Sequence, residues 1–486
     1  MAASSTATIG SYELTSRAIN EPPAAAVREG SGIFNETQRL GSRYGQDYSD
    51  GGVESVAAQN ASAEVAESWK YPRQNVFRTG AAFWSLLTSG ANDAAYGALI
   101  PYLEKYYNLS YIIVSLVFLS PFVGYILAAV LNNTLHRRIG QRGIGITCGI
   151  CHILAYIIIA VHPPYPVLVL AYCLAGFGNG ISDAAWNAWI GNLDRANETL
   201  GFLHAFYGVG GVISPLIATN MIAKADLPWY TFYYVMVSRT CWYAYGKYSI
   251  DRYTQIGLAT IEFIACTWAF WSNGPEVYRQ TMDASNEDNQ GMKEALFKLP
   301  FARVTWLCAA FLLCYVGVEV SVGGWIVQFM IRVRKAENYP AGMTSMGFWL
   351  GLAVGRAILG FVTPLLGVKV AVSMYLPAAM ALQLIFWLVP SFYVSAVTVA
   401  LQGFFLGPLF PAVVVATTKM LPKHLHVSTI GFAAAFGGSG AAILPFAVGA
   451  IAQAKGVKTL QPIILAFLTA LLGLWLCLPR IGKKRD

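Results

Sequence analysis

The sequence predicts an all-helical integral membrane protein, with twelve transmembrane helices in two six-helix halves that repeat each other. Of its 486 residues, 56% are hydrophobic and only 12% are charged, which is about half the charged fraction of an average soluble domain. Apolar stretches long enough to cross a bilayer recur twelve times. Glycine positions of the first half return in the second half after a constant shift. The composition excludes a soluble multidomain enzyme and a disordered protein.

The predicted elements follow one another in a simple order. Residues 1–75 are polar, contain no apolar segment of a signal peptide, and predict a disordered cytoplasmic tail. Two apolar halves, 76–271 and 301–480, are joined by a polar cytoplasmic linker over 272–300, and a short cytoplasmic tail is expected over 481–486. The predicted spans are 79–101, 109–131, 142–161, 165–190, 199–222, 228–271, 301–331, 341–365, 369–389, 391–416, 426–453 and 459–479.

Basic residues in the connections predict the orientation. Lys and Arg gather between His136 and Arg142, after the tenth span and at the C-terminal end, so both termini are expected in the cytoplasm. The connection after the seventh span departs from this rule, because it places Arg332, Arg334 and Lys335 outside. Three connections outweigh one, and the net charge of +8 then reflects membrane orientation rather than a nucleic-acid partner. The plasma membrane is expected, with a vacuolar or other internal membrane as the alternative.

The internal repeat is visible in the glycines. A shift of 227 residues makes five pairs coincide in corresponding spans. They are Gly90 with Gly317, Gly97 with Gly324, Gly124 with Gly351, Gly140 with Gly367, and Gly176 with Gly403. Two halves in the same orientation are the parallel repeat of secondary transporters, in which substrate binds near the midplane between the halves. A channel would more often show one repeat per subunit and a filter loop.

The sixth span is too long because of residues 237–255. This piece carries four charged side chains, Arg239, Lys247, Asp251 and Arg252, and each ion costs about 2.5–3.5 kcal/mol at a helix centre. Without it, 229–236 and 256–271 join as one apolar helix of 24 residues. The piece opens with Val-Ser, which GTAAGT or GTGAGT can encode, and closes with Gln, which CAG encodes. These are the nucleotide sequences of the two splice sites of an intron. We therefore predict a retained intron of 57 nucleotides (19 codons), with a genuine insertion as the alternative.

Ionisable side chains inside a span are costly and usually functional. Asp93 lies in the first span, Asp183 in the fourth and Glu319 in the seventh, and all three spans can line a central cavity. Removal from water disfavours the charged form of a carboxylate, which is the property that proton coupling needs. We predict these three as proton-coupling residues. A structural carboxylate that is paired with an amide, a hydroxyl or a helix N-terminus is the alternative for each.

Polar and aromatic side chains near these acids are the predicted substrate-binding residues. They are Asn92, Tyr96, Asn187, Trp186, His204, Trp325, Gln328 and Gln402. A hydrogen-bonded core histidine is the alternative for His204. The predicted gating residues are Gly124, Arg138, Gly140 and Arg142 around the connection after the second span, together with Arg356 in the eighth. His152 and Glu262 are interpreted as structural.

Motifs of metal and nucleotide chemistry are weak in this chain. Cys148 and Cys151 are one helical turn apart in an apolar run with no second pair nearby, so we interpret them as packing residues. The run Gly176-Phe-Gly-Asn-Gly180 lacks the following Lys of a phosphate-binding loop. We expect no metal site, no cofactor, no disulfide and no enzymatic activity.

Several motifs resemble a known family. Asn92-Asp93 followed by Leu-Ile-Pro, the fourth-span pattern from Gly178 to Asn187, and LHAFYGVGGVISPLIAT resemble the major facilitator superfamily over residues 76–480. More narrowly, they are similar to fungal relatives of the fucose/glucose/galactose–proton symporters. The resemblance implies proton coupling and substrate binding by Asp93 and Asp183, with Asn187 as a partner for a substrate hydroxyl. Asp183 stands where the fucose permease has a glutamate, and the gating connection lacks the family's usual Asp.

The expected function is therefore proton-coupled secondary transport of a small polar solute, a sugar, by alternating access. The expected partners are this small-molecule substrate, protons and the lipid bilayer, without nucleic acid, for a monomeric protein. A proton antiporter that exports drugs or secondary metabolites is one alternative, although the fifth span shows YGVGGVISP rather than an antiporter G-P-x-x-G-G. A non-transporting nutrient sensor is the other, and the polar N-terminal tail keeps it open.

Overall fold

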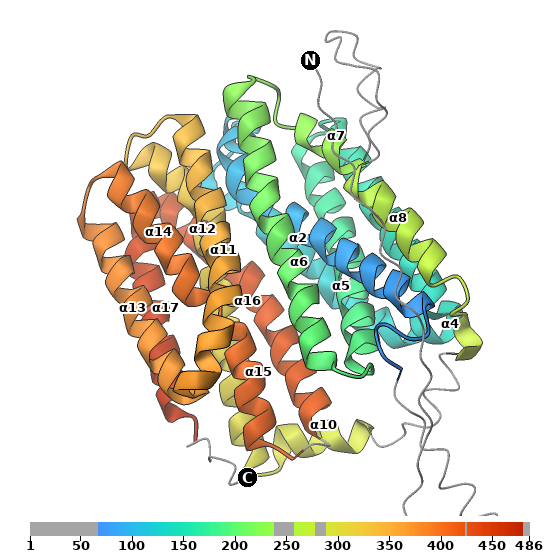
Figure 1. Ribbon diagram of the computed structural model, residues 1–486. Coiled ribbons are helices and arrows are strands. Elements are labelled where there is room, and N and C mark those ends of the chain that lie inside the picture. Colours follow the sequence, from blue (N-terminus) through green and yellow to red (C-terminus); the bar gives the residue numbers. More distant parts are fainter. Residues whose placement is uncertain (1–66, 238–256, 278–287, 423–424, 480–486) are drawn as a thin grey trace, which may run out of the picture. The chain divides into compact units, whose positions relative to one another are not determined.

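The computed structural model describes residues 67–237, 257–277, 288–422 and 425–479, and every named element in these ranges is a helix (Figure 1). The all-helical class that the composition predicts is confirmed for this part of the chain. The predicted tail as far as residue 66, and residues 238–256 of the sixth span, lie outside the described ranges.

The first half contains the helices up to the linker. They are α2 (Gln74–Tyr107), α3 (Tyr111–Val114), α4 (Leu116–Ala160), α5 (Tyr165–Gly191), α6 (Ala196–Thr219), η1 (Asn220–Lys224), α7 (Thr231–Val237) and α8 (Leu258–Ala269). The second and third predicted spans form one element, α4, whose backbone turns at Gly140 with φ 65° and ψ −175°. A residue with a Cβ is disfavoured at this positive φ, so glycine is required where the two spans meet.

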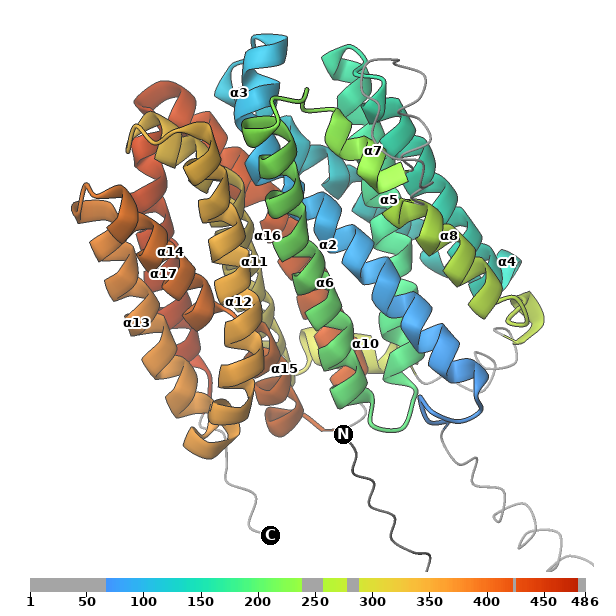
Figure 2. The ribbon, with the colours of Figure 1, turned by 45° about the horizontal axis from the view of Figure 1, so that its top comes forward.

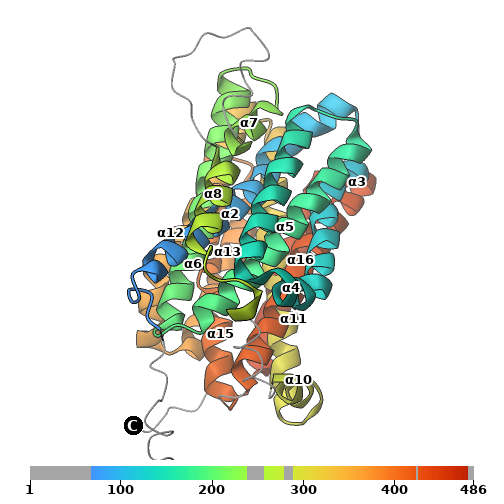
Figure 3. The same cartoon turned by 90° about the vertical axis from the view of Figure 1, so that its right-hand side faces the viewer.

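The second half follows the short helix α10 (Asp288–Phe297), which lies within the predicted linker and packs against α11 and α16 (Figure 3). Its helices are α11 (Phe301–Arg332), α12 (Asn338–Leu366), α13 (Val368–Leu388), α14 (Phe392–Leu406), α15 (Leu409–Met420), α16 (His426–Lys455), η4 (Val457–Thr459) and α17 (Leu460–Cys477). The predicted span 391–416 is divided, because α14 ends before Gly407 and Pro408.

Ten helical segments of the described chain are long and apolar enough to cross a membrane. The first predicted span lies in α2, which is not among the ten because Ser, Thr, Asn and Asp side chains interrupt its apolar stretch. The sixth predicted span is represented by α7 and α8, which are too short by themselves. The helical membrane architecture is confirmed for the described residues, and the count of twelve stays a prediction.

The two halves use corresponding glycines at corresponding helix crossings. A Cβ on Gly124 of α4 would meet the backbone carbonyl of Cys173 in α5, and a Cβ on Gly351 of α12 would meet that of Ala400 in α14. Small residues let membrane helices approach closely. Both glycines of this predicted repeat pair therefore lie at close helix contacts, one in each predicted half.

The predicted halves meet along a few helices. In the first half α2 packs against α6 and α4 against α5, and in the second α11 packs against α16 and α12 against α14. Across the boundary α2 contacts α11, α6 contacts α12, and α4 contacts α16. Figures 1 and 2 show the green α6 beside the orange α12. Most predicted site residues lie on these boundary helices or on α5, which packs against α2.

Candidate functional site

Asp93 of α2 is surrounded by uncharged hydrogen-bond donors. Its Oδ1 accepts from the amides of Asn92 and Asn179, both at 3.2 Å, and its Oδ2 accepts from the Tyr207 hydroxyl at 3.0 Å. The Asn92 amide also donates to the Tyr96 hydroxyl at 2.8 Å. Three predicted residues are thus brought together, with donors from α5 and α6 that the sequence did not indicate. Asn179 is four residues before Asp183 and Tyr207 three after His204, and this helical spacing was the available signal.

Asp183 of α5 forms a second polar group. The Asn187 amide donates to its carboxylate at 2.7 Å, and the Asn187 carbonyl oxygen lies 3.2 Å from Nε2 of His204 on α6. The His204 ring lies 5.9 Å from that of Phe410, which belongs to α15 of the second half. The structure therefore brings Asp183 and Asn187 together, as their spacing predicted, adds His204 from the next span, and places this group beside the opposite half.

Glu319 of α11 differs from both aspartates because it has a cationic partner. Nη2 of Arg356, in α12, lies 3.1 and 3.3 Å from the two carboxylate oxygens of Glu319. The Nε of Arg356 donates to the Gly407 carbonyl at 3.3 Å. Both side chains are largely buried, with exposed fractions of 6% and 17%. A predicted proton-coupling residue and a predicted gating residue are therefore the two members of one ion pair.

The two predicted tryptophans are held within the helix packing. Trp186 is buried, donates to the Ser85 hydroxyl at 3.1 Å and stacks on Phe270 with ring centroids 4.5 Å apart. Trp325 is also buried and donates to the Pro445 carbonyl at 2.9 Å. The structure does not bring either of them into the groups around Asp93 and Asp183.

Gln402 belongs to a separate chain of amides in the second half. It donates to Gln383 at 2.9 Å, and Gln383 donates to Gln461 at 2.6 Å. These residues link α14, α13 and α17, and all three are buried. Gln402 therefore lies apart from the two aspartate groups.

Gln328 lies at an ion pair between the halves. Its amide donates to Glu104 of α2, and Nη2 of Arg332, in α11, lies 3.0 Å from the same carboxylate. Arg334, a few residues on, donates to the Phe386 carbonyl at 2.5 Å. Two of the three cations that broke the orientation rule thus have defined partners. A cavity of about 420 Å³ lies beside Glu104 and Arg332.

The remaining predicted gating residues connect the turn in α4 to the end of the first half. Arg142 donates its backbone N–H to the Asn273 carbonyl at 3.0 Å, and its guanidinium lies 5.1 Å from the Trp271 ring. Gly140 is buried at the turn, whereas Arg138 is exposed. Gly124 serves the helix contact described above.

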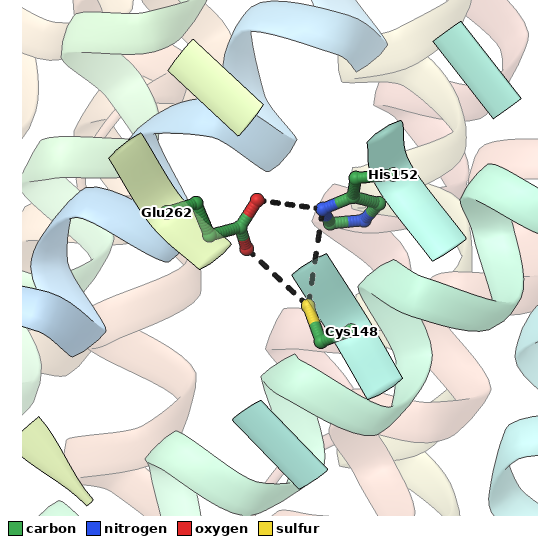
Figure 4. A group of neighbouring side chains, drawn as sticks. All are labelled: Cys148, His152 and Glu262. Atoms are coloured by element: carbon green, nitrogen blue, oxygen red, sulfur yellow. Dashed lines mark hydrogen bonds and ion pairs between the residues drawn. The ribbon is translucent and has the colours of Figure 1, made fainter. Parts of the chain in front are cut away.

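A third polar group, interpreted from sequence as structural or as packing, is fully buried in the first half (Figure 4). His152 Nδ1 lies 2.7 Å from Glu262 Oε2, and Cys148 Sγ lies 3.3 Å from Glu262 Oε1 and 3.8 Å from His152 Nδ1. Ser85 donates to Glu262 Oε1 at 2.6 Å. The available signal was the spacing of Cys148 and His152, which puts both on one face of α4.

These helices and buried polar groups agree with a match to a known family. A family model for the Major Facilitator Superfamily matches residues 82–390. This is more than half of the chain, which therefore belongs to this superfamily of transporters and is a multi-pass integral membrane protein.

Two relatives and one solved structure extend this result. "Bypass of stop codon protein 6" of Saccharomyces cerevisiae is 28% identical over 431 residues, covering 82% of this chain and 81% of the relative. Glucose/mannose transporter GlcP of Bacillus subtilis is 23% identical over 409 residues, covering 79% and 92%. The crystal structure of a D-xylose-proton symporter shares the fold, with a TM-score of 0.64 and 14% identity over 83% of this chain and 98% of that chain. The predicted resemblance is confirmed.

Proposed function

We propose that this protein is a proton-coupled symporter that moves a sugar across the membrane by alternating access. The observation that carries the proposal is the environment of Asp93, a carboxylate that three uncharged donors from three helices surround. The names of similar proteins support the substrate class, because one is a glucose/mannose transporter and another a D-xylose-proton symporter.

The surroundings of Asp93 suit both the charged and the protonated form. Three donors satisfy the carboxylate, and an unsatisfied charge inside a span would be costly. In the described part of the chain, Oδ1 of Asn92 and Oδ1 of Asn179 are buried and accept no hydrogen bond. These amide oxygens can accept from the O–H of a protonated Asp93. Because the neighbours are uncharged, protonation changes the net charge of the site by one.

The group around Asp183 is suited to sugar hydroxyls. A hydroxyl both donates and accepts, a carboxylate accepts, and an amide and a neutral imidazole can do both. Asp183, Asn187 and His204 therefore offer complementary partners on one side. The Phe410 ring from the second half supplies an apolar face on the other, so that a bound sugar would contact both halves.

Helix α6 connects the two groups. Tyr207 donates to Asp93 and His204 contacts Asn187, and the two residues are three positions apart on one face of the helix. Protonation of Asp93 would weaken the bond from Tyr207, and a shift of α6 would then carry His204 with it. Because α6 packs against α12 of the second half, such a shift reaches the boundary between the halves.

The test is sugar uptake by the purified full-length protein in proteoliposomes with an imposed inward proton gradient. Radiolabelled glucose, mannose and xylose serve as probes. The wild-type protein should accumulate at least one of them above its external concentration. Asp93→Asn should lose gradient-driven accumulation and retain exchange of labelled for unlabelled sugar, because exchange needs no net proton movement.

Asp226→Asn is the matched control, because Asp226 is exposed and lies in the connection before α7; its uptake should equal that of the wild type. Uptake that ignores both the gradient and Asp93→Asn would overturn the proposal. Proton-driven export of the probe would instead favour the antiporter alternative.

A further inference from the structure

The buried group of Cys148, His152 and Glu262 joins two helices that are distant in sequence. Cys148 and His152 are four residues apart on α4, and Glu262 faces them from the short helix α8 (Figure 4). The relevant sulfur, nitrogen and oxygen atoms all lie within 4.8 Å of one another. None of the three side chains is more than 1% exposed.

We propose that these three side chains bind one divalent metal ion of the zinc class. Cysteine sulfur, histidine nitrogen and a carboxylate oxygen are the ligands of protein zinc sites. A mixed set with one thiolate favours a transition metal over Mg²⁺ or Ca²⁺, which prefer oxygen ligands. Two ligands one helical turn apart on one helix are a frequent arrangement in such sites.

The charge balance of the site permits a metal ion to replace protons inside a membrane protein. Without metal, the group has one proton on the Cys148 thiol and one shared between His152 and Glu262, and its net charge is zero. A divalent ion displaces both protons, and its two charges are balanced by the thiolate and the carboxylate. The net charge is again zero, so that metal binding leaves no uncompensated charge in a low-dielectric region.

The observed spacing is close to that of a tetrahedral site. Bonds of about 2.0 Å to nitrogen and oxygen and about 2.3 Å to sulfur separate tetrahedral ligand atoms by roughly 3.3–3.6 Å. Cys148 Sγ lies 3.3 Å from Glu262 Oε1 and 3.8 Å from His152 Nδ1, which suits three of the four positions of such a site with Oε1 as the ligand oxygen. The 2.7 Å contact joins His152 Nδ1 to the other carboxylate oxygen, Oε2, and corresponds to the shared proton that a metal would displace.

Groups around the ligands are placed as outer partners of a metal site. Ser85 donates to Glu262 and itself accepts from Trp186. Metal at Nδ1 of His152 would leave Nε2 as a donor, and in the described structure that buried atom has no partner. Outer partners of this kind orient metal ligands and strengthen binding.

A metal ion at this site would cross-link α8 to α4. Helix α8 has 12 residues and packs against both α4 and α2. This role is structural, and its test can be separated from that of sugar transport because the three ligands include neither Asp93 nor Asp183.

The test measures metal content rather than transport. Full-length protein in detergent is stripped with a chelator, exposed to Zn²⁺ or Co²⁺, desalted and analysed by inductively coupled plasma mass spectrometry. About one metal ion per chain is expected for the wild type. With Co²⁺, the wild type should also show a thiolate-to-metal charge-transfer absorption.

Cys148→Ser should remove that absorption and the bound metal, whereas Cys151→Ser is the matched control and should change neither. Ser85→Ala should weaken metal binding by about 10-fold to 100-fold. A wild type that takes up no metal, or a Co²⁺ spectrum without a thiolate band, overturns the proposal even where Cys148→Ser fails to fold. Metal that persists unchanged in a folded Cys148→Ser variant overturns it as well.

Discussion

Three carboxylates are stabilised in three different ways within the spanning helices. Asp93 has three uncharged donors, Glu319 has the Arg356 guanidinium, and Glu262 has His152 with Ser85 and Cys148. Protonation of Glu319 would break its buried ion pair and leave the Arg356 guanidinium as a costly isolated charge. Protonation of Asp93 leaves no such charge, because its hydrogen-bond donors are uncharged. Of these three, Asp93 is therefore the carboxylate that we propose to change its charge during a transport cycle.

Asn187 provides the residue-scale prediction. Asn187→Ala should raise the KM for sugar about tenfold, because one hydrogen bond to a substrate hydroxyl costs about 1.4 kcal/mol when it is lost. The dependence of uptake on the proton gradient should persist, because Asp93 is untouched. Initial rates of uptake over a range of sugar concentrations give both quantities.

Asn192→Ala is the control, because Asn192 is exposed at the end of the same helix. A KM for Asn187→Ala equal to that of the wild type would mean that the Asp183 group does not contact the sugar.

At the scale of elements, the ends of α2 and α11 are tied across the boundary between the halves. Glu104 pairs with Arg332 at 3.0 Å and also accepts from Gln328. Nearby, the backbone N–H of Tyr111 donates to Gln453 of α16 at 2.8 Å. In the predicted orientation this end faces outside, so we predict that these contacts restrain opening on the exterior side.

Breaking the Glu104–Arg332 pair should favour opening on that side. Such a partly exposed pair is worth about 0.2–1 kcal/mol, which corresponds to a population change of up to about fivefold. Ser345 is a suitable reporter, because it is buried against Gly97 of α2. In a Ser345→Cys background, Glu104→Ala should increase the rate of labelling by a membrane-impermeant thiol reagent.

Exchanging the two charges, with Glu104→Arg and Arg332→Glu together, should return labelling toward the starting rate. Lys105→Ala is the control, because Lys105 is an exposed neighbour of Glu104. Equal labelling rates in all variants would show that the pair does not restrain opening.

For the whole molecule, the sixth predicted span bears on how many helices cross the membrane. Helix α7 ends at Val237 and α8 begins at Leu258, yet the Thr260 hydroxyl donates to the Val237 carbonyl at 2.6 Å. Were 237–255 removed, Ile256 would take the place of Val237, and Thr260 would be four residues after it. A threonine that bonds the carbonyl four residues earlier is an ordinary helical contact, so this bond agrees with the prediction that the two segments join as one helix.

The retained-intron hypothesis predicts that the mature transcript lacks the 57 nucleotides for residues 237–255. Reverse transcription and sequencing across the codons for 229–271 would show the shorter product. Amplification across the codons for 301–331 is the control for intact transcript. Mature mRNA that encodes 237–255 would establish an insertion instead.

The sequence identified the fold class and selected candidate site residues because both depend on local properties. The composition and length of the apolar stretches predicted which segments enter the membrane. The rarity of acidic residues in those segments then singled out Asp93, Asp183 and Glu319. The spacing of Asp183 and Asn187 also predicted their contact correctly. Trp186, by contrast, was expected at the substrate, yet the structure places it beneath Ser85 and Phe270, because the rotation of α5 decides which face is enclosed.

By itself, therefore, the sequence determined a helical membrane protein whose repeated glycines and few intramembrane acids belong to a transporter. Only the tertiary structure decided which distant groups meet: Tyr207 with Asp93, Arg356 with Glu319, and His152 with Glu262, the last across 110 residues. The physical reason is that hydrophobicity acts on each segment separately. Pairing between helices depends on how each one is rotated and shifted against its neighbours, and no single segment carries that information.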